Sequence, residues 1–258
     1  MALVKILGSC SGTEPMNDRH HTSIVISEND RNYFFDAGEN CSYSAHLGGI
    51  DLMKTRAIFI SHTHFDHIGG LMGLFWTIRK LHNRYKLPVA DGEITLFISP
   101  VEVWESIHNA LKHTEGDFKN SFKIIAKVPK IGKTYNDDNL SVTATESHHL
   151  PRLIDGNIRA FSYRIDLKSG ASVVFSGDIK NTDDLVNTVG DGCDLLLCET
   201  GHHSVADVCK FAETHNVKKL VFVHHGRAIL ENRPEVAEAV ENCKIPVEIA
   251  FDGMNIEL

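Results

Sequence analysis

Short apolar runs, separated by polar turns, recur along the whole chain and predict β-strands. The runs at 57–60, 172–175 and 220–223 are continuous, which is typical of strands buried on both faces. The run at 140–145 alternates between apolar and polar residues, as a half-buried strand does. The full set of expected strands lies near residues 2–8, 22–27, 32–36, 57–60, 95–98, 122–128, 140–145, 159–166, 172–176, 194–198, 219–223 and 247–251.

Apolar residues at helical spacing predict helices between many of these strands. They are expected near residues 68–81, 101–112, 182–189, 205–215 and 234–242, and the last opens with Pro234 in its first turn. Hairpins early in the chain, followed by alternating strands and helices, predict an α/β (α+β) fold with mixed sheets between helices. The chain has 258 residues and no Pro-rich or low-complexity linker, so we expect one domain over residues 1–258.

Three histidines and an aspartate follow the apolar run at 57–60 within one short stretch, as His62, His64, Asp66 and His67. If the chain leaves a strand there and enters a helix near Ile68, His62 and His64 face one point while Asp66 and His67 face a second. Imidazole nitrogens with one carboxylate suit zinc, iron and related ions better than calcium or magnesium, which prefer oxygen. The stretch therefore predicts a metal site for two adjacent cations.

Three further strand ends carry side chains that could complete such a site. Asp178 follows the run at 172–175, and a carboxylate there can bridge two ions. A hydrolytic centre with two metal ions needs such a shared group and a closing ligand for each ion. Candidate closing ligands come in adjacent pairs, His148 with His149 and His224 with His225. The residues themselves leave open which member of each pair is the ligand.

The order and spacing of these motifs resemble the metallo-β-lactamase superfamily. The segments at 7–15 and 34–39, with Arg19 and Ser23 between them, are similar to its ribonuclease Z-like branch. The resemblance runs from Leu7 to about Arg227. It implies a four-layer αββα sandwich of two mixed β-sheets flanked by helices. It also implies two divalent metal ions, for which zinc is preferred and manganese or iron are alternatives.

The resemblance also assigns the metal ligands position by position. One ion would be held by His62, His64 and His148. The other would be held by Asp66, His67 and His224, with Asp178 between the two ions. His148 is preferred because Pro151 stands three residues after it, as in the family pattern, and His224 because it directly follows the apolar strand. His149 and His225 stay open as alternatives.

The same resemblance names residues for catalysis. In ribonuclease Z-like enzymes a glutamate at a strand end and a histidine before the next helix help to protonate the leaving oxygen. Glu199 and His203 match these positions, and imidazole titrates near neutrality, as a general acid should. The alternative is that His203 only flanks the helix. Asp66 is assigned a catalytic role besides ligation, and Asp36 is expected to orient a ligand histidine.

Together these features predict a metal-dependent hydrolase, a phosphodiesterase that cleaves a small or nucleotide phosphodiester with a metal-bridging hydroxide. The 29 residues between His148 and Asp178 are too few for the basic arm with which ribonuclease Z-type enzymes clamp tRNA, and the net charge is -8. Nucleic acid is therefore disfavoured as a substrate. The alternatives are a ribonuclease Z-type tRNA processing nuclease, a thioester, lactone or sulfate-ester hydrolase, and a non-catalytic metal-binding carrier.

The remaining features concern location and partners. No stretch approaches the roughly 20 apolar residues of a membrane span, and the start of the chain resembles a strand rather than a signal peptide. These features predict a cytoplasmic protein without a membrane partner. The predicted metal centre, not these features, indicates a small anionic substrate. The polar, basic segment at 81–92 is interpreted as a lid or as the contact of a homodimer.

Overall fold

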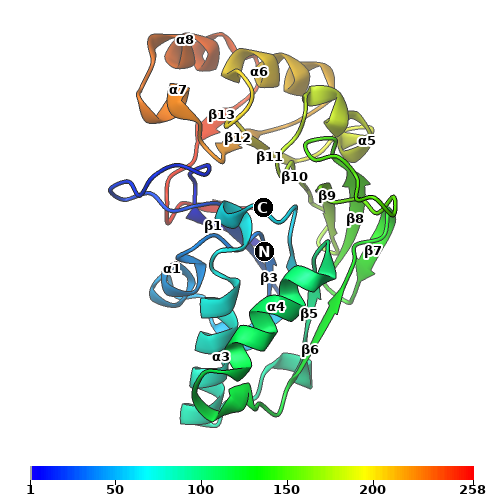
Figure 1. The fold of residues 1–258 in the computed structure, drawn as a ribbon. Coiled ribbons are helices and arrows are strands. Elements are labelled where there is room, and N and C mark those ends of the chain that lie inside the picture. Colours follow the sequence, from blue (N-terminus) through cyan, green and yellow to red (C-terminus); the bar gives the residue numbers. More distant parts are fainter. Residues whose placement is uncertain (1) are drawn as a thin grey trace. The chain divides into compact units, whose positions relative to one another are not determined.

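The computed structural model describes residues 2–258, which group into two compact units, each with its own β-sheet (Figure 1). The first unit comprises the chain up to Gly8, residues 12–129 and residues 252–258. The second comprises residues 9–11 and 130–251. Both sheets are mixed and flanked by helices, so the predicted fold class is confirmed. That the chain forms one domain stays a prediction.

The sheet of the first unit has the strand order β14-β1-β2-β3-β4-β5-β6. Neighbours from β14 to β3 are antiparallel, and those from β3 to β6 are parallel. Because β1 pairs with β14, the two ends of the chain lie in one sheet. The strands are β1 (Leu3–Gly8), β2 (Ser23–Glu28), β3 (Arg31–Phe35), β4 (Thr55–Phe59), β5 (Glu93–Phe97), β6 (Lys123–Lys127) and β14 (Asn255–Glu257).

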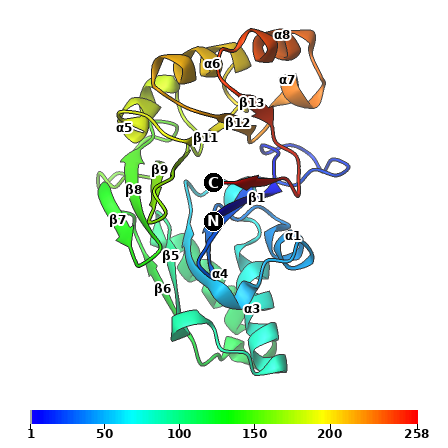
Figure 2. The ribbon, with the colours of Figure 1, turned by 180° about the vertical axis from the view of Figure 1, so that it is seen from behind.

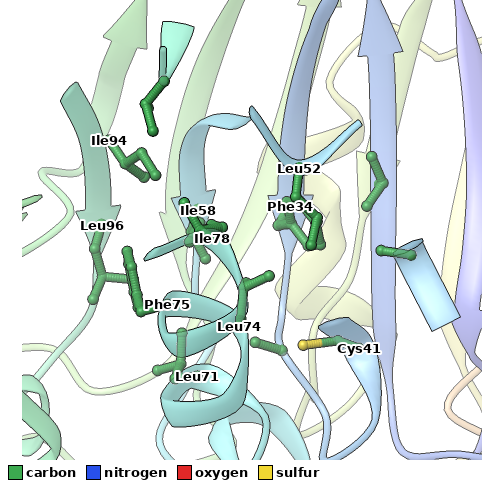
Figure 3. Packing of buried hydrophobic residues seen from close by; sticks show 14 of the residues in the cluster. Phe34, Cys41, Leu52, Ile58, Leu71, Leu74, Phe75, Ile78, Ile94 and Leu96 are labelled. Carbon is green, nitrogen blue, oxygen red and sulfur yellow. The ribbon is translucent and has the colours of Figure 1, made fainter. Parts of the chain in front are cut away.

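Helices of the first unit cover its sheet with an apolar face. In α3 the residues Leu71, Leu74, Phe75 and Ile78 are buried at the spacing of one helix face, and they pack with strand residues such as Ile58 (Figure 3). The helices are α1 (Cys41–Leu47), α2 (Phe65–Ile68), α3 (Leu71–Tyr85) and α4 (Val101–Lys112), with 3-10 turns η1 (Leu52–Lys54), η2 (Ala90–Gly92) and η3 (Glu115–Phe118).

The sheet of the second unit has the order β13-β12-β11-β10-β9-β8-β7. Neighbours from β7 to β10 are antiparallel, and those from β10 to β13 are parallel. The strands are β7 (Gly132–Asn136), β8 (Leu140–Glu146), β9 (Phe161–Leu167), β10 (Ser172–Phe175), β11 (Leu195–Glu199), β12 (Leu220–Val223) and β13 (Val247–Ile249).

Helices of the second unit follow its parallel strands, and α6 lies beside α8 (Figure 2). The side chain of Ser204 caps α6 by accepting a hydrogen bond from the backbone N of Asp207, and Pro234 is in the first turn of α8 as expected. The helices are α5 (Val186–Val189), α6 (Val205–Thr214), α7 (Arg227–Leu230) and α8 (Pro234–Asn242), and η4 (Thr182–Leu185) precedes α5.

Every predicted strand is present, with ends that differ by a few residues. Strands β7 and β14 were not predicted from the sequence. The first is an edge strand whose exposed and half-buried residues are mostly polar, and the second has only three residues. Helices α1 and α7 were not predicted either. The helix expected at 68–81 is α3, preceded by the single turn α2, and the helix expected at 182–189 is the 3-10 turn η4 followed by the single turn α5. Among residues 2–258 no helix has the length and apolarity that a membrane crossing needs.

Candidate metal centre

The first unit gathers four candidate metal-ligating side chains just after β4. The ring centroids of His62 and His64 are 4.4 Å apart, and those of His62 and His67 are 4.0 Å apart. Nε2 of His67 lies 3.4 Å from Oδ2 of Asp66. These four residues, which we call the first ligand group, were all predicted from the sequence. The structure brings them together at the start of α2.

Asp36 holds one member of this group, His67, and the neighbouring Ser61 by hydrogen bonds. It follows β3, has a positive φ of 58° and is fully buried. Its Oδ1 accepts a hydrogen bond from the backbone N of Ser61 at 2.6 Å. Its Oδ2 accepts from Ser61 Oγ at 2.7 Å and from His67 Nδ1 at 2.6 Å. Since Nδ1 of His67 is held by a carboxylate, Nε2 is the nitrogen that would bind a metal ion, and the carboxylate would raise its basicity. The orienting contact expected of Asp36 is present.

The second unit builds its group around Asp178, which follows β10 and is 2% exposed. Oδ2 of Asp178 lies 3.6 Å from Nε2 of His149, and Oδ1 lies 3.3 Å from Nε2 of His224. These histidines follow β8 and β12, so the ends of three strands converge on one carboxylate. We call Asp178, His149 and His224 the second ligand group.

The structure separates the adjacent histidines after β8. The side chain of His148, the preferred ligand in the sequence analysis, is 63% exposed, and its Nδ1 donates to Oδ1 of Asp184 at 2.6 Å. The ring of His149 instead approaches Asp178. The spacing to Pro151 could not reveal this, because the backbone of this loop turns consecutive side chains to different sides. The geometry favours His149, the alternative left open.

The adjacent histidines after β12 separate in the same way. His225 is fully buried, its Nε2 donates to the carbonyl of Ala250 at 2.8 Å, and its backbone N donates to Ser9 O at 2.8 Å. His224 has a φ of 47°, which turns its ring toward Asp178. His224, the residue preferred from the sequence, is therefore the member of this pair that lies beside Asp178.

Glu199 links the loops that follow β10 and β11 in the second unit by hydrogen bonds to Ile179 and His202. It ends β11, is fully buried, and its Oε1 accepts from the backbone N of Ile179 at 2.9 Å. Its Oε2 accepts from the backbone N of His202 at 3.0 Å and from Nδ1 of that ring at 2.9 Å. Burial raises the pKa of Glu199, but hydrogen bonds with His202 and His224 outweigh it and lower the pKa to about 2. The glutamate is therefore an anion at neutral pH.

His202 and its neighbour His203, the residue proposed from the sequence, both approach Glu199, and Nε2 of His203 lies 3.6 Å from Oε1 of that residue. Nε2 of His203 donates to the carbonyl of Ile179 at 2.8 Å. Nδ1 of His202 lies 3.8 Å from Oδ2 of Asp178, and its hydrogen bond with Glu199 raises the pKa of the imidazole. The residue next to the second ligand group is therefore His202. Nothing in the sequence distinguishes two adjacent histidines before a helix, so this residue was missed.

Both groups have the donors that a divalent transition metal requires. The first ligand group offers three imidazoles and a carboxylate. In the second unit, donor atoms of Asp178, Glu199, His202 and His224 all lie within 4.8 Å of one another. Imidazole with carboxylate suits zinc, iron or manganese, and the hydrogen bond between Nδ1 of His67 and Asp36 matches the supporting contacts common around such metals.

The chain is similar to several known proteins. The family model of the anti-Pycsar protein Apyc1 matches residues 2–241. A ribonuclease Z from Methanothermobacter thermautotrophicus is 24% identical over 312 residues, which cover 100% of this chain and 97% of that protein. A ribonuclease Z from Listeria monocytogenes is 32% identical over 162 residues, which cover 62% of this chain and 47%, or about half, of that protein.

Among solved structures, the metallo-β-lactamase fold protein YhfI from Bacillus subtilis superposes with a TM-score of 0.76 at 18% identity, covering 100% of this chain and 99% of the other. This likeness confirms the predicted fold, and the ribonuclease Z relatives confirm the predicted branch. The chain is a member of the metallo-β-lactamase superfamily, in its ribonuclease Z-like branch, and belongs to the family of the anti-Pycsar protein Apyc1.

Proposed function

We propose that this protein is a metal-dependent phosphodiesterase that hydrolyses a small anionic phosphodiester, nucleotide phosphodiesters included. The observation that carries the proposal is that each unit collects its own group of histidine and aspartate donors at the carboxyl ends of its strands. Membership of a hydrolase superfamily supports it. The proposal requires the two ligand groups to serve one centre with two divalent ions.

The proposed ligand set revises the sequence prediction at one position. One ion would be held by His62, His64 and His149. The other would be held by Asp66, His67 and His224, and Asp178 would be shared. Zinc is the preferred metal because imidazole dominates the set, and manganese or iron are the alternatives. Asp66 stays a catalytic residue as well as a ligand.

The chain's own residues would prepare the reaction in three ways. When bound, the metal ions supply an acidified water as nucleophile and positive charge for the phosphate. Asp36 and Ser61 hold the first ligand group in place before substrate arrives. Glu199 holds Nδ1 of His202, which leaves Nε2 of that ring to give a proton to the leaving oxygen. We propose His202 for the acid role, and His203, which the family resemblance assigns to it and whose Nε2 lies 3.6 Å from Oε1 of Glu199, stays the alternative.

A small substrate agrees with how the chain uses the stretch between His149 and Asp178. Much of it forms β9 and β10, both of which are paired on two sides within the sheet of the second unit. What remains is the short segment 150–160 and a turn, so a long clamp for tRNA has no room there. A net charge of -8 also opposes binding of a polyanion.

Ribonuclease Z-type processing of tRNA is the second candidate, favoured by the names of the curated relatives. One set of assays separates the candidates. The metal-loaded full-length protein would be given bis-para-nitrophenyl phosphate, cyclic nucleotides, a precursor tRNA and a panel of thioesters. We expect turnover of the first two. Cleavage of precursor tRNA alone, or of thioesters alone, would contradict the proposal.

The aspartate at the centre of the second ligand group tests whether the protein is an enzyme or a carrier. Asp178→Ala is expected to lower turnover about 10³-fold, since a shared ligand contributes several kcal/mol of transition-state stabilisation. The matched control is Asp183→Asn, a nearby exposed aspartate, which should keep turnover within about twofold. A metal-binding carrier would show no turnover in the unsubstituted protein and only weaker metal binding in Asp178→Ala.

A further inference from the structure

Two loops of the second unit supply His149 and Asp178, and they are tied to each other by side chains that are not ligands. We call residues 147–152 the His loop and residues 177–181 the Asp loop. The first tie is Ser147, which is 1% exposed. Its Oγ donates to the carbonyl of Asp178 at 2.6 Å and accepts from the backbone N of His149 at 3.2 Å. One hydroxyl therefore joins the backbones of two proposed ligands.

The second tie is Asp184, in the turn η4, whose side chain is 6% exposed. Its Oδ2 accepts from the backbone N of His148 at 3.0 Å and from the backbone N of Lys180 at 2.9 Å. Its Oδ1 accepts from Nδ1 of His148 at 2.6 Å. A single carboxylate oxygen thus bridges the His loop and the Asp loop, and the other oxygen holds a side chain of the His loop.

We propose that Asp184 is a positioning residue of the metal centre, which together with Ser147 sets the spacing between His149 and Asp178 before a metal binds. This inference rests on the proposed function, in which those two residues are ligands. A loop that is already ordered loses little entropy when a metal binds, so the ties act on metal affinity. Asp184 bonds to the backbones of His148 and Lys180, which lie close in sequence to the two ligands, and it acts through these backbones.

The contacts of Asp184 also give the pair His148 and His149 a division of roles. The ring of His148 is held by Asp184, whereas Nε2 of His149 lies 3.6 Å from Oδ2 of Asp178. The two rings lie in different surroundings. His148 and Asp184 line an open cavity of about 660 Å³, whereas the side chain of His149 is only 13% exposed. The pair is thus one anchor and one ligand.

The test compares Asp184→Ala and Asp184→Asn with Asp183→Ala, an exposed neighbour in the same turn. Each full-length protein would be loaded with zinc, and zinc loss to a chelator would be measured without substrate, beside the thermal unfolding midpoint. We expect Asp184→Ala to weaken zinc retention about 10- to 100-fold. Asp184→Asn keeps an oxygen that can accept the two backbone donors, so its loss should be less than about tenfold. Asp183→Ala should match the unsubstituted protein.

A second measurement separates positioning from a general loss of stability. Ser147→Ala and the double variant with Asp184→Ala complete a cycle, and the two losses of zinc retention should be non-additive because both ties hold the same two loops. Unchanged zinc retention in Asp184→Ala, or a loss that follows the unfolding midpoint equally in all variants, would overturn the inference. Because no substrate is used, a failure of the phosphodiesterase assay in the unsubstituted protein leaves this result interpretable.

Discussion

The two units of this protein repeat one strand pattern, but an aspartate that follows the same strand of that pattern has a different role in each. In each sheet, antiparallel neighbours give way to parallel ones at one strand, β3 in the first unit and β10 in the second. An aspartate follows that strand in both, as Asp36 and as Asp178. Asp36 holds Nδ1 of His67, whereas Asp178 faces Nε2 of His149 and His224. Asp36 directly follows its strand and Asp178 stands a few residues after its own, so an aspartate near the end of this strand orients a ligand in one unit and is itself the proposed ligand in the other.

The two ligand groups also differ in how the chain assembles them. The first comes from a single turn after β4, so its members lie close in sequence. The second comes from the ends of β8, β10 and β12, so its geometry depends on the register of a whole sheet. Substitutions should therefore disturb the geometry of the first ligand group mainly when they alter Asp36. They should disturb the second ligand group when they alter the loops or close contacts that join distant strands.

The largest effect is expected from the ligand that the sequence could not choose. His149→Ala should lower kcat/KM about 10³-fold, because a lost ligand costs more than the 10- to 100-fold typical of a supporting contact. His148→Ala should cost less than about tenfold, since the two backbone donors to Asp184 remain. Steady-state rates of both variants, with zinc content measured in parallel, check the pair. A larger loss of kcat/KM in His148→Ala than in His149→Ala would favour His148 as the ligand, as its spacing to Pro151 predicts.

Next in size is the orienting aspartate of the first unit. Asp36→Ala removes the partner of His67 Nδ1 and two bonds to Ser61, so zinc retention should weaken about 10- to 100-fold. Asp30→Ala, which alters an exposed aspartate paired with Lys54, is the matched control and should retain zinc normally. Chelator competition on the two zinc-loaded proteins checks this. Equal retention would show that the first ligand group keeps its geometry without Asp36.

The sequence predicts the strands and the first ligand group, but it does not predict which histidine of an adjacent pair faces the site. The strands were predictable because buried strands are continuous apolar runs, and the first ligand group was predictable because its spacing is local. The pairs at 148 and 149 and at 202 and 203 were not, because the direction of adjacent side chains in a loop is set by contacts from elsewhere. For His149 those contacts come from Asp184 and Ser147, and for His202 from Glu199. No pattern around the histidines records them.

A close backbone contact in the second unit gives the third prediction. A Cβ added at Gly201 would lie 2.7 Å from Nδ1 of His224 and 3.3 Å from Oε2 of Glu199, so Gly201→Ala must displace the ring. We expect kcat to fall about tenfold and the free energy of unfolding to fall by about 1–3 kcal/mol, as for other overpacked sites. Chemical denaturation and rate measurements check both. A variant with unchanged kcat would mean that His224 can shift without losing its role.

The smallest effect is expected in the scaffold of the first unit, away from either ligand group. Gly73 lies within α3, and a Cβ there would meet only Ser42 Oγ at 3.6 Å, an ordinary contact. Gly73→Ala should therefore raise the free energy of unfolding by about 0.5–1 kcal/mol, because alanine loses less backbone entropy in a helix. Zinc retention and kcat should not change. If the added stability also altered zinc retention, the first ligand group would depend on the packing of α3 and not only on Asp36, and the contrast drawn between a locally held group and a distributed one would fail.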